Sequence, residues 1–378
     1  MGVDGKPRVL VASVVFSSRI FRVYIVPGAV FQSVMVAGGY GTGREMVEYF
    51  TSYGFLGGLL GLAVSFVTLG LIMALTFEFA RLFRVYDYRH FFLQLTGRGW
   101  ILYEILIILA FLLILAVLAA AAGNILRDNF DLPYGVGLSV MLVVIGVLTF
   151  FGRELITRAL TYWSFFLYAV FIAFFLSVFS GNWGLISDAF SSGEVLDGWW
   201  QSGLQYGLYN VAAAPLLLYV ARVFETRAEA FKSGAIAGAI AVVPAVIFQF
   251  AFFAAYPEIL DQAIPTYWLM GQLGMTVLMF FYSVMLFGTF IETGAGMLQG
   301  IIERIDAWLM ETRGRRLSRV AHAMLAISSI VISALFSLWG ITNLIAKGFG
   351  TMAWLFLVIY VIPLLTIGLY KIIRADRT

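Results

Sequence analysis

The chain has 378 residues, of which 62% are hydrophobic and only 12% are charged. Because soluble globular domains carry about 25% charged residues, the composition excludes a soluble protein and predicts an all-α integral membrane protein. The lack of cysteine excludes disulfides, thiol catalysis and cysteine-ligated metals. A formal net charge of +3 is too small to indicate nucleic-acid binding.

Apolar runs of about 20 residues, the length that crosses a bilayer, predict ten membrane-spanning helices. They cover residues 21–53, 54–83, 99–126, 134–152, 154–180, 202–225, 233–255, 272–302, 320–345 and 350–373. Residues 1–20 and 374–378 are predicted to be tails. Residues 181–201 are predicted to form an external loop that lies along the outer interface as a lid. The spans divide into two repeats of five, residues 21–180 and residues 202–373.

The distribution of basic residues predicts the orientation in the membrane. With both termini in the cytoplasm, 21 of the 24 lysines and arginines lie in cytoplasmic segments; the exceptions are Arg44, Arg127 and Lys347. Such an excess of positive charge is typical of cytoplasmic loops. We therefore expect a multi-pass protein of the cell (inner) membrane with cytoplasmic termini.

The first span contains a glycine-rich break. Four of the six residues from Gly38 to Gly43 are glycine, and two opposite charges, Arg44 and Glu45, follow directly. Each interior glycine costs a helix about 1 kcal/mol relative to alanine, and a charge at mid-bilayer costs at least about 2.5 kcal/mol. Such backbone is tolerated only where it is buried in protein or lines a cavity. We therefore predict an interruption near residues 37–43.

A second break is predicted in the sixth span, within the segment from Tyr206 to Pro215. Proline removes a helix hydrogen bond and clashes with the preceding turn, and the Asn210 side chain competes for backbone partners. Packing or simple kinking is the alternative for this segment. Interrupted helices at matching positions of two halves that run in opposite directions are, however, typical of transporters with inverted repeats.

These residues carry two resemblances. Two interrupted helices at positions one and six of a ten-span chain resemble the LeuT fold of the amino acid–polyamine–cation superfamily. The string GGYGTGREMVEYF resembles the glycine-rich first-helix motif of YkvI-type membrane proteins, and Tyr209-Asn210 resembles the Tyr-Asn of their sixth helix. In that motif the glycines are typically followed by Gln-Glu, so Arg44 departs from it. The implied fold is a 5+5 inverted repeat with discontinuous helices 1 and 6.

Glu292 is a candidate coupling-ion residue. Thr289, Glu292 and Thr293 in the eighth span are spaced i, i+3, i+4, so they share one helical face. The LeuT resemblance implies a cation site between this face and the carbonyls of Ala37 and Tyr40. Glu292 would either take up a proton in each cycle or neutralise a bound Na⁺. The alternative is a static buried ion pair with a basic residue, for which Arg44 is one candidate.

The two breaks supply the candidate solute-binding residues. They are Gly39, Tyr40, Gly41, Thr42, Gly43, Arg44, Glu45, Tyr206, Tyr209 and Asn210. Arg44 has two interpretations. It receives a solute carboxylate at the positive end of the half-helix that begins near residue 43, or it pairs with Glu48 as a gate or structural ion pair and leaves Glu45 for a solute amine.

The function that these features predict is secondary active transport. We expect Na⁺ or H⁺ to drive the uptake of a small polar solute, an amino acid or a related zwitterion or amine, by alternating access. A LeuT-fold sensor that binds a solute without moving it, as in spore germinant receptors, is the alternative. The chain lacks HExxH and GxSxG motifs, and we predict neither an enzymatic activity nor a cofactor other than the coupling ion.

Overall fold

The computed structural model describes residues 18–36, 38–151 and 153–375. All regular elements in these ranges are helices. In the first half they are η1 (Phe21–Ile25), α2 (Val26–Met35), α3 (Gly38–Thr42), α4 (Arg44–Tyr49), η2 (Thr51–Tyr53), α5 (Phe55–Phe83), α6 (Tyr88–Thr96), η3 (Gly97–Gly99), α7 (Trp100–Phe130), α8 (Tyr134–Phe151) and α9 (Arg153–Ser192).

The second half begins with α10 (Trp199–Val211), η4 (Ala214–Val223), α11 (Arg227–Phe252), η5 (Phe253–Ala255), η6 (Glu258–Asp261), α12 (Pro265–Gln272), α13 (Thr276–Arg313) and α14 (Arg319–Ser337). The last span is divided into α15 (Ile341–Asn343), η7 (Leu344–Phe349), α16 (Gly350–Phe356), η8 (Leu357–Val361), η9 (Leu364–Gly368) and α17 (Leu369–Ala375).

Within the described residues, seven helices are long and apolar enough to cross a membrane, and the bent pair α10–η4 makes an eighth. Two shorter apolar helices, Phe21–Met35 and Tyr134–Thr149, occupy the first and fourth predicted spans. The all-helical membrane class is therefore confirmed. The count of ten spans and the inverted symmetry of the two halves stay predictions.

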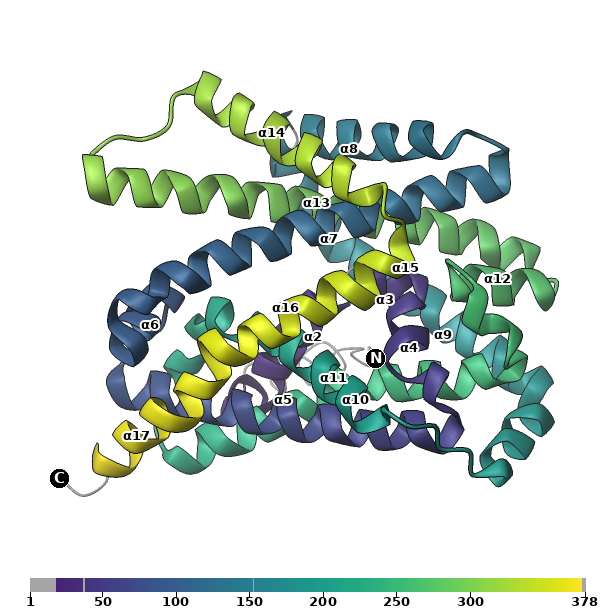
Figure 1. Cartoon of the computed structure of the whole chain (residues 1–378), viewed down its shortest axis with the longest axis horizontal. Coiled ribbons are helices and arrows are strands. Elements are labelled where there is room, and N and C mark those ends of the chain that lie inside the picture. Colours follow the sequence, from purple (N-terminus) through teal and green to yellow (C-terminus); the bar gives the residue numbers. More distant parts are fainter. Residues whose placement is uncertain (1–17, 37, 152, 376–378) are drawn as a thin grey trace, which may run out of the picture.

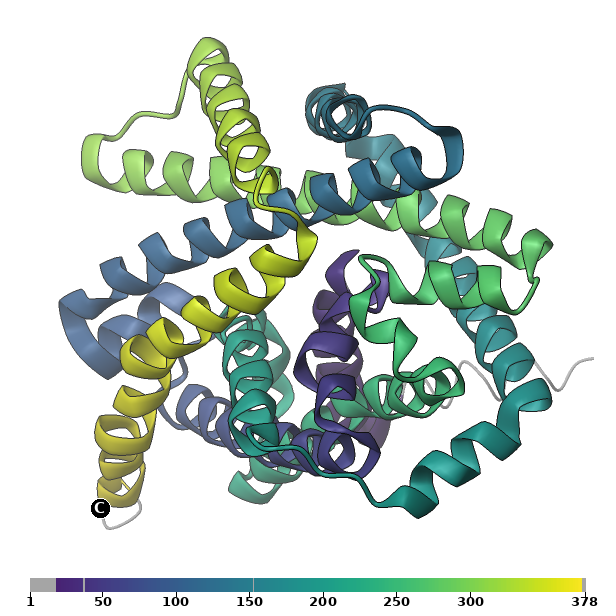
Figure 2. The same ribbon diagram turned by 45° about the vertical axis from the view of Figure 1, so that its right-hand side comes forward.

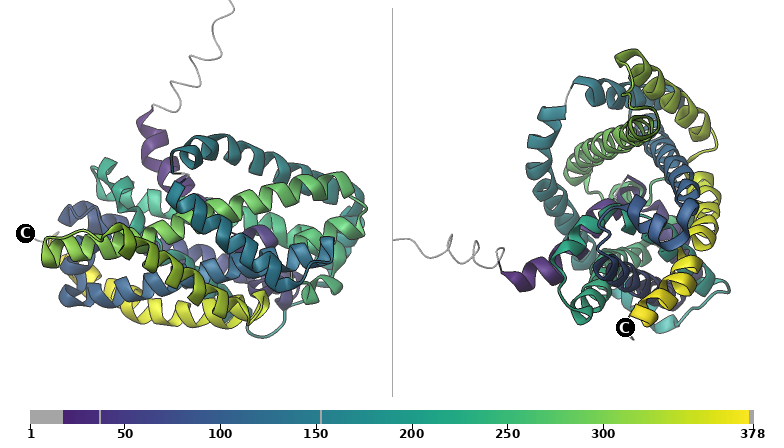
Figure 3. Two further views of the ribbon diagram at one scale, coloured as in Figure 1. Left: turned by 90° about the horizontal axis from the view of Figure 1, so that it is seen from above. Right: turned by 90° about the vertical axis from the view of Figure 1, so that its left-hand side faces the viewer.

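The helices form two groups that are visible in Figure 1. The first bundle contains the broken first span, α5, α11 and the pair α10–η4; the second contains α7, α8, α13 and α14. Figure 3 shows the long helices of both bundles running in the same general direction. In the first bundle, α5 packs closely on α11 through small residues, and a side chain at Gly238 would lie 2.7 Å from the backbone nitrogen of Gly70.

Two predicted boundaries are wrong. The segment predicted as an external loop, residues 181–201, is helical up to Ser192 with a kink at Asn182, and α10 begins at Trp199. The predicted division near residues 345–350 lies instead at Leu338–Gly340, where Gly340 has a φ of 78° that favours glycine. Lys347, predicted to lie in a loop, is inside η7.

Candidate functional site

Both predicted breaks are present. The first span is interrupted around Val36 and again at Gly43, whose φ of 79° lies in the left-handed region. The sixth span bends by 65° between α10 and η4. Ala37 lies outside the described residues, so its expected role as an ion ligand has no structural outcome.

A central cavity lies between the two bundles. Tyr209 and Asn210, from the second break, and Val34 and Met35, just before the first break, contribute to its wall. Other lining residues come from α7, the junction of α10 and η4, η4 itself, α13 and the last span: Ile107, Ala110, Phe111, Ile114, Ala212, Ala213, Leu216, Met297, Phe349, Met352 and Phe356. The cavity is therefore mainly apolar, and its polar groups are concentrated at the second break.

An inner vestibule adjoins this cavity and shares Val34, Phe111, Ala213, Leu216 and Met297 with it. Tyr88, Glu303 and Arg304 line the vestibule but not the central cavity, and their segments are predicted to be cytoplasmic. The Arg304 guanidinium is 3.1 Å from the Glu104 carboxylate and lies over the Tyr88 ring at 4.3 Å. The central cavity thus continues toward the end of the molecule at which Arg304 lies.

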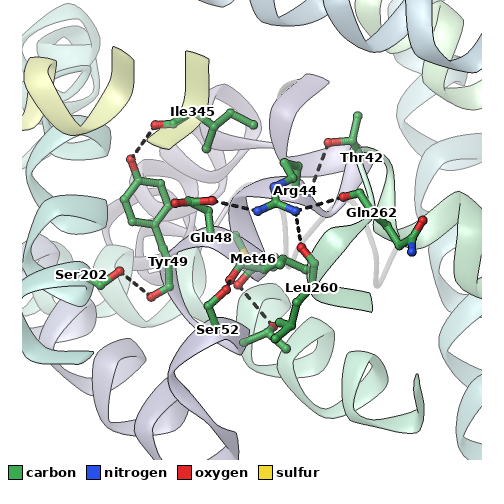
Figure 4. Close-up of polar contacts among 12 residues, drawn as sticks. Thr42, Arg44, Met46, Glu48, Tyr49, Ser52, Ser202, Leu260, Gln262 and Ile345 are labelled. Atoms are coloured by element: carbon green, nitrogen blue, oxygen red, sulfur yellow. Dashed lines mark hydrogen bonds and ion pairs between the residues drawn. The ribbon is translucent and has the colours of Figure 1, made fainter. Parts of the chain in front are cut away.

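At the opposite end, the half-helix α4 lies beside η6 (Figure 2), and polar contacts join it to the segment η6–α12 (Figure 4). The buried Arg44 guanidinium donates to the carbonyl oxygens of Leu260 at 2.7 Å and Gln262 at 3.0 Å. It also pairs with the Glu48 carboxylate at 2.9 Å. The predicted Arg44–Glu48 contact is therefore present, and the alternative pair between Arg44 and Glu292 is not.

The backbone of the first break is held by neighbouring side chains as well. The Thr266 hydroxyl donates to the Thr42 carbonyl at 2.8 Å, and the Tyr282 hydroxyl donates to the Gly41 carbonyl at 2.5 Å. Both carbonyls belong to candidate solute-binding residues, and in this structure they are bonded to side chains of α12 and α13. Gly39 lies in α3, and Gly43 is not among the described residues that line the central cavity.

Glu45 is buried and faces a different direction from Arg44. It accepts a hydrogen bond from the Tyr209 hydroxyl. The Tyr49 ring lies 5.6 Å from the Tyr209 ring and 5.7 Å from the Tyr206 ring. Tyr206 is fully buried and does not line the central cavity. The structure therefore brings together Glu45, Tyr206 and Tyr209 from the two breaks, and it adds Tyr49, which the sequence analysis missed.

Glu292 lines a separate small pocket with Thr289 and Thr293, as their spacing predicts. The first span contributes Ser33 and Val36, and α9 contributes Leu167 and Tyr168. Tyr40 is not among the residues that line this pocket, and its ring packs edge-on against Phe248 at 5.6 Å. The expected role of its carbonyl as an ion ligand stays a prediction. Ser33 was missed, although a hydroxyl one turn before a helix break is a recognisable signal.

Across residues 18–36, 38–151 and 153–375, no group of three or more His, Asp or Glu side chains lies close enough together to hold a metal ion.

The chain is similar to solved transporters at low sequence identity. Over 97% of this chain and 81% of the other, it matches a manganese transporter of Eremococcus coleocola with 13% identity and a TM-score of 0.61. Over 88% of this chain and 78% of the other, it matches a Na⁺-coupled sialic acid symporter with 13% identity and a TM-score of 0.57. Both have the LeuT fold, so this expected fold is confirmed.

Among curated proteins, the chain is 22% identical over 292 residues to an uncharacterized membrane protein, YkvI, of Bacillus subtilis strain 168. The match covers 74% of this chain and 80% of that protein. This similarity accords with the resemblance of the glycine-rich motif. No family model matches the chain.

Proposed function

We propose that the protein is a secondary active transporter that carries a small polar organic solute by alternating access. The observation that supports this most strongly is the central cavity, whose wall joins the two interrupted spans. Sites of this kind, at the junction of discontinuous helices, bind the solute in transporters built from repeats. An amino acid or a related zwitterion or amine suits a cavity with its polar groups at one end.

The structure corresponds to an inward-open state in this proposal. The cavity continues into the inner vestibule, whereas Arg44, Thr266 and Tyr282 hold the first break closed on the other side. In the opposite state these bonds break and the vestibule closes. Rocking of the first bundle against the second would exchange the two states around a fixed site. Both termini are cytoplasmic in this arrangement, and the membrane is the cell membrane.

The coupling ion, Na⁺ or H⁺, is assigned to the pocket that contains Glu292. Carboxylate and hydroxyl oxygens of Glu292, Thr289, Thr293 and Ser33 are grouped there, and hard oxygen ligands suit Na⁺, while the carboxylate alone suffices for H⁺. Ser33 belongs to α2, which ends at the first break. Binding an ion here would therefore fix the position of α2 relative to α13 and couple the ion to the solute.

Transport is distinguished from ligand sensing by a flux measurement on the purified chain. A thermal-shift screen of amino acids and amines, with and without Na⁺, first identifies a stabilising solute, because a ligand that binds only the folded state raises the melting temperature. Vesicles containing only this protein and preloaded with that solute should then show saturable counterflow of the labelled solute. Stabilisation without any counterflow would contradict transport and favour a sensor.

A further inference from the structure

The Glu45 carboxylate lies in a cluster of aromatic hydroxyls. Tyr209 donates a hydrogen bond to it. The side chains of Tyr40, Tyr49 and Tyr206 also interact electrostatically with this carboxylate. Glu45 is 5% exposed, and Tyr40 and Tyr206 are at most 1% exposed. The two breaks therefore enclose an acidic group among tyrosines, out of contact with solvent.

No ion pair to Glu45 is present in the described part of the chain. The neighbouring Arg44 does not neutralise it, because its guanidinium is bonded to Glu48 and to the carbonyls of Leu260 and Gln262. A buried carboxylate without a counter-ion is unfavourable and must be neutralised by a proton or a cation. The uncompensated carboxylate of Glu45 therefore makes this cluster suited to binding a cation.

Two hydroxyls in the cluster are without partners. Among the described residues, the Tyr40 and Tyr206 hydroxyl oxygens make no hydrogen bond although both are buried. Buried polar atoms are normally satisfied, so each such exception requires an explanation. A primary ammonium group has three N–H donors. The Glu45 carboxylate and these two phenol oxygens supply three acceptors, and the surrounding rings favour a cation.

Tyr209 separates this cluster from the central cavity. Its hydroxyl bonds to Glu45, while its ring lines the cavity and stacks on Phe349 at 4.9 Å. A rotation of this one side chain would open the central cavity to the Glu45 carboxylate. Within the described residues, the cavity wall contains no basic side chain that would bind a solute carboxylate.

We propose, on the basis of the transport function above, that the solute is a monovalent primary amine with an apolar body. Its ammonium group replaces the Tyr209 hydroxyl at Glu45 and donates to Tyr40 and Tyr206. Its apolar part occupies the central cavity beside Met35 and Phe349. This selects a net cation over the zwitterionic amino acids.

The test uses the purified full-length chain in detergent and four probes at equal ionic strength: n-butylamine, norvaline, butyltrimethylammonium and NaCl. Norvaline is butylamine with an added carboxylate, and the trimethyl compound has no N–H donors. Butylamine should raise the melting temperature saturably, with an apparent affinity at least about tenfold above those of the other two organic probes, as the loss of one charged contact predicts. NaCl alone should not reproduce the shift.

Glu45→Gln should abolish the response to butylamine and Tyr206→Phe should weaken it, whereas the exposed-site control Glu258→Gln should leave it unchanged. Equal stabilisation by norvaline, no shift with butylamine, or a full butylamine response in Glu45→Gln overturns the amine proposal. If Glu45→Gln does not fold, the comparison of butylamine with norvaline in the unaltered chain decides. If butylamine binds but shows no counterflow, the transport function is contradicted and the amine site is not. If another solute shows counterflow that Tyr206→Phe does not change, the amine site is contradicted and the transport function is not.

Discussion

Replacing Glu292 with glutamine should abolish ion-driven accumulation of the solute while the protein still folds. Glu292 is the acidic residue of a pocket that also contains Ser33, Thr289 and Thr293. A hydrogen bond to a charged group contributes about 1.5–3 kcal/mol, so loss of the charge should weaken ion binding on the order of 10- to 100-fold. Accumulation in proteoliposomes under an imposed Na⁺ or H⁺ gradient measures the effect.

Glu258→Gln is the matched control, because Glu258 is an exposed carboxylate in η6. It should accumulate solute as the unaltered chain does. Solute counterflow, which needs no net ion movement, should persist in Glu292→Gln at a reduced level. Undiminished accumulation by this variant under the same gradient would show that Glu292 does not carry the coupling ion.

Arg44→Ala should destabilise the closed outer side without abolishing solute binding. The change leaves the Glu48 carboxylate without its partner and frees the carbonyls of Leu260 and Gln262. Removing one partner of a buried ion pair costs about 3–5 kcal/mol; the lower value is expected here, since the Glu48 side chain is 25% exposed. The melting temperature should fall, and solute affinity measured by thermal shift should change less than about threefold.

The double variant Arg44→Ala/Glu48→Ala separates the ion pair from the carbonyl contacts. It removes both charges, so it should recover part of the stability that Arg44→Ala loses, as a double-mutant cycle would reveal. A folded Arg44→Ala protein that has lost solute binding would identify Arg44 as a ligand for the solute and contradict its role in outer closure.

Local sequence was sufficient to predict the breaks and the pairs within one helix. The glycines from Gly38 to Gly43 and the proline at Pro215 change backbone propensity where they stand. The Arg44–Glu48 pair and the shared face of Thr289 and Glu292 follow from helical periodicity alone. The order of the spans and the LeuT resemblance then placed the two breaks beside one another.

Contacts between segments that are distant in sequence cannot be predicted from local sequence patterns. Arg44 meets Leu260 across 216 positions of sequence, and no periodicity relates two such residues. For the same reason the sequence does not reveal that Ser33 lies beside Glu292. Hydropathy places the helix end near Lys347 because that residue is charged. The true end at Gly340 depends on a positive φ angle, which hydropathy does not detect.

The accessibility of the central cavity from the two sides of the membrane tests alternating access most directly. The chain contains no cysteine, so Leu216→Cys, in the wall shared by the cavity and the vestibule, provides a single reactive site. Leu218→Cys, at a fully buried position, is the control. A membrane-impermeant maleimide should label Leu216→Cys from the cytoplasmic side, and a stabilising solute should change that rate. Labelling from the external side alone, or a rate that no such solute changes, would contradict the account.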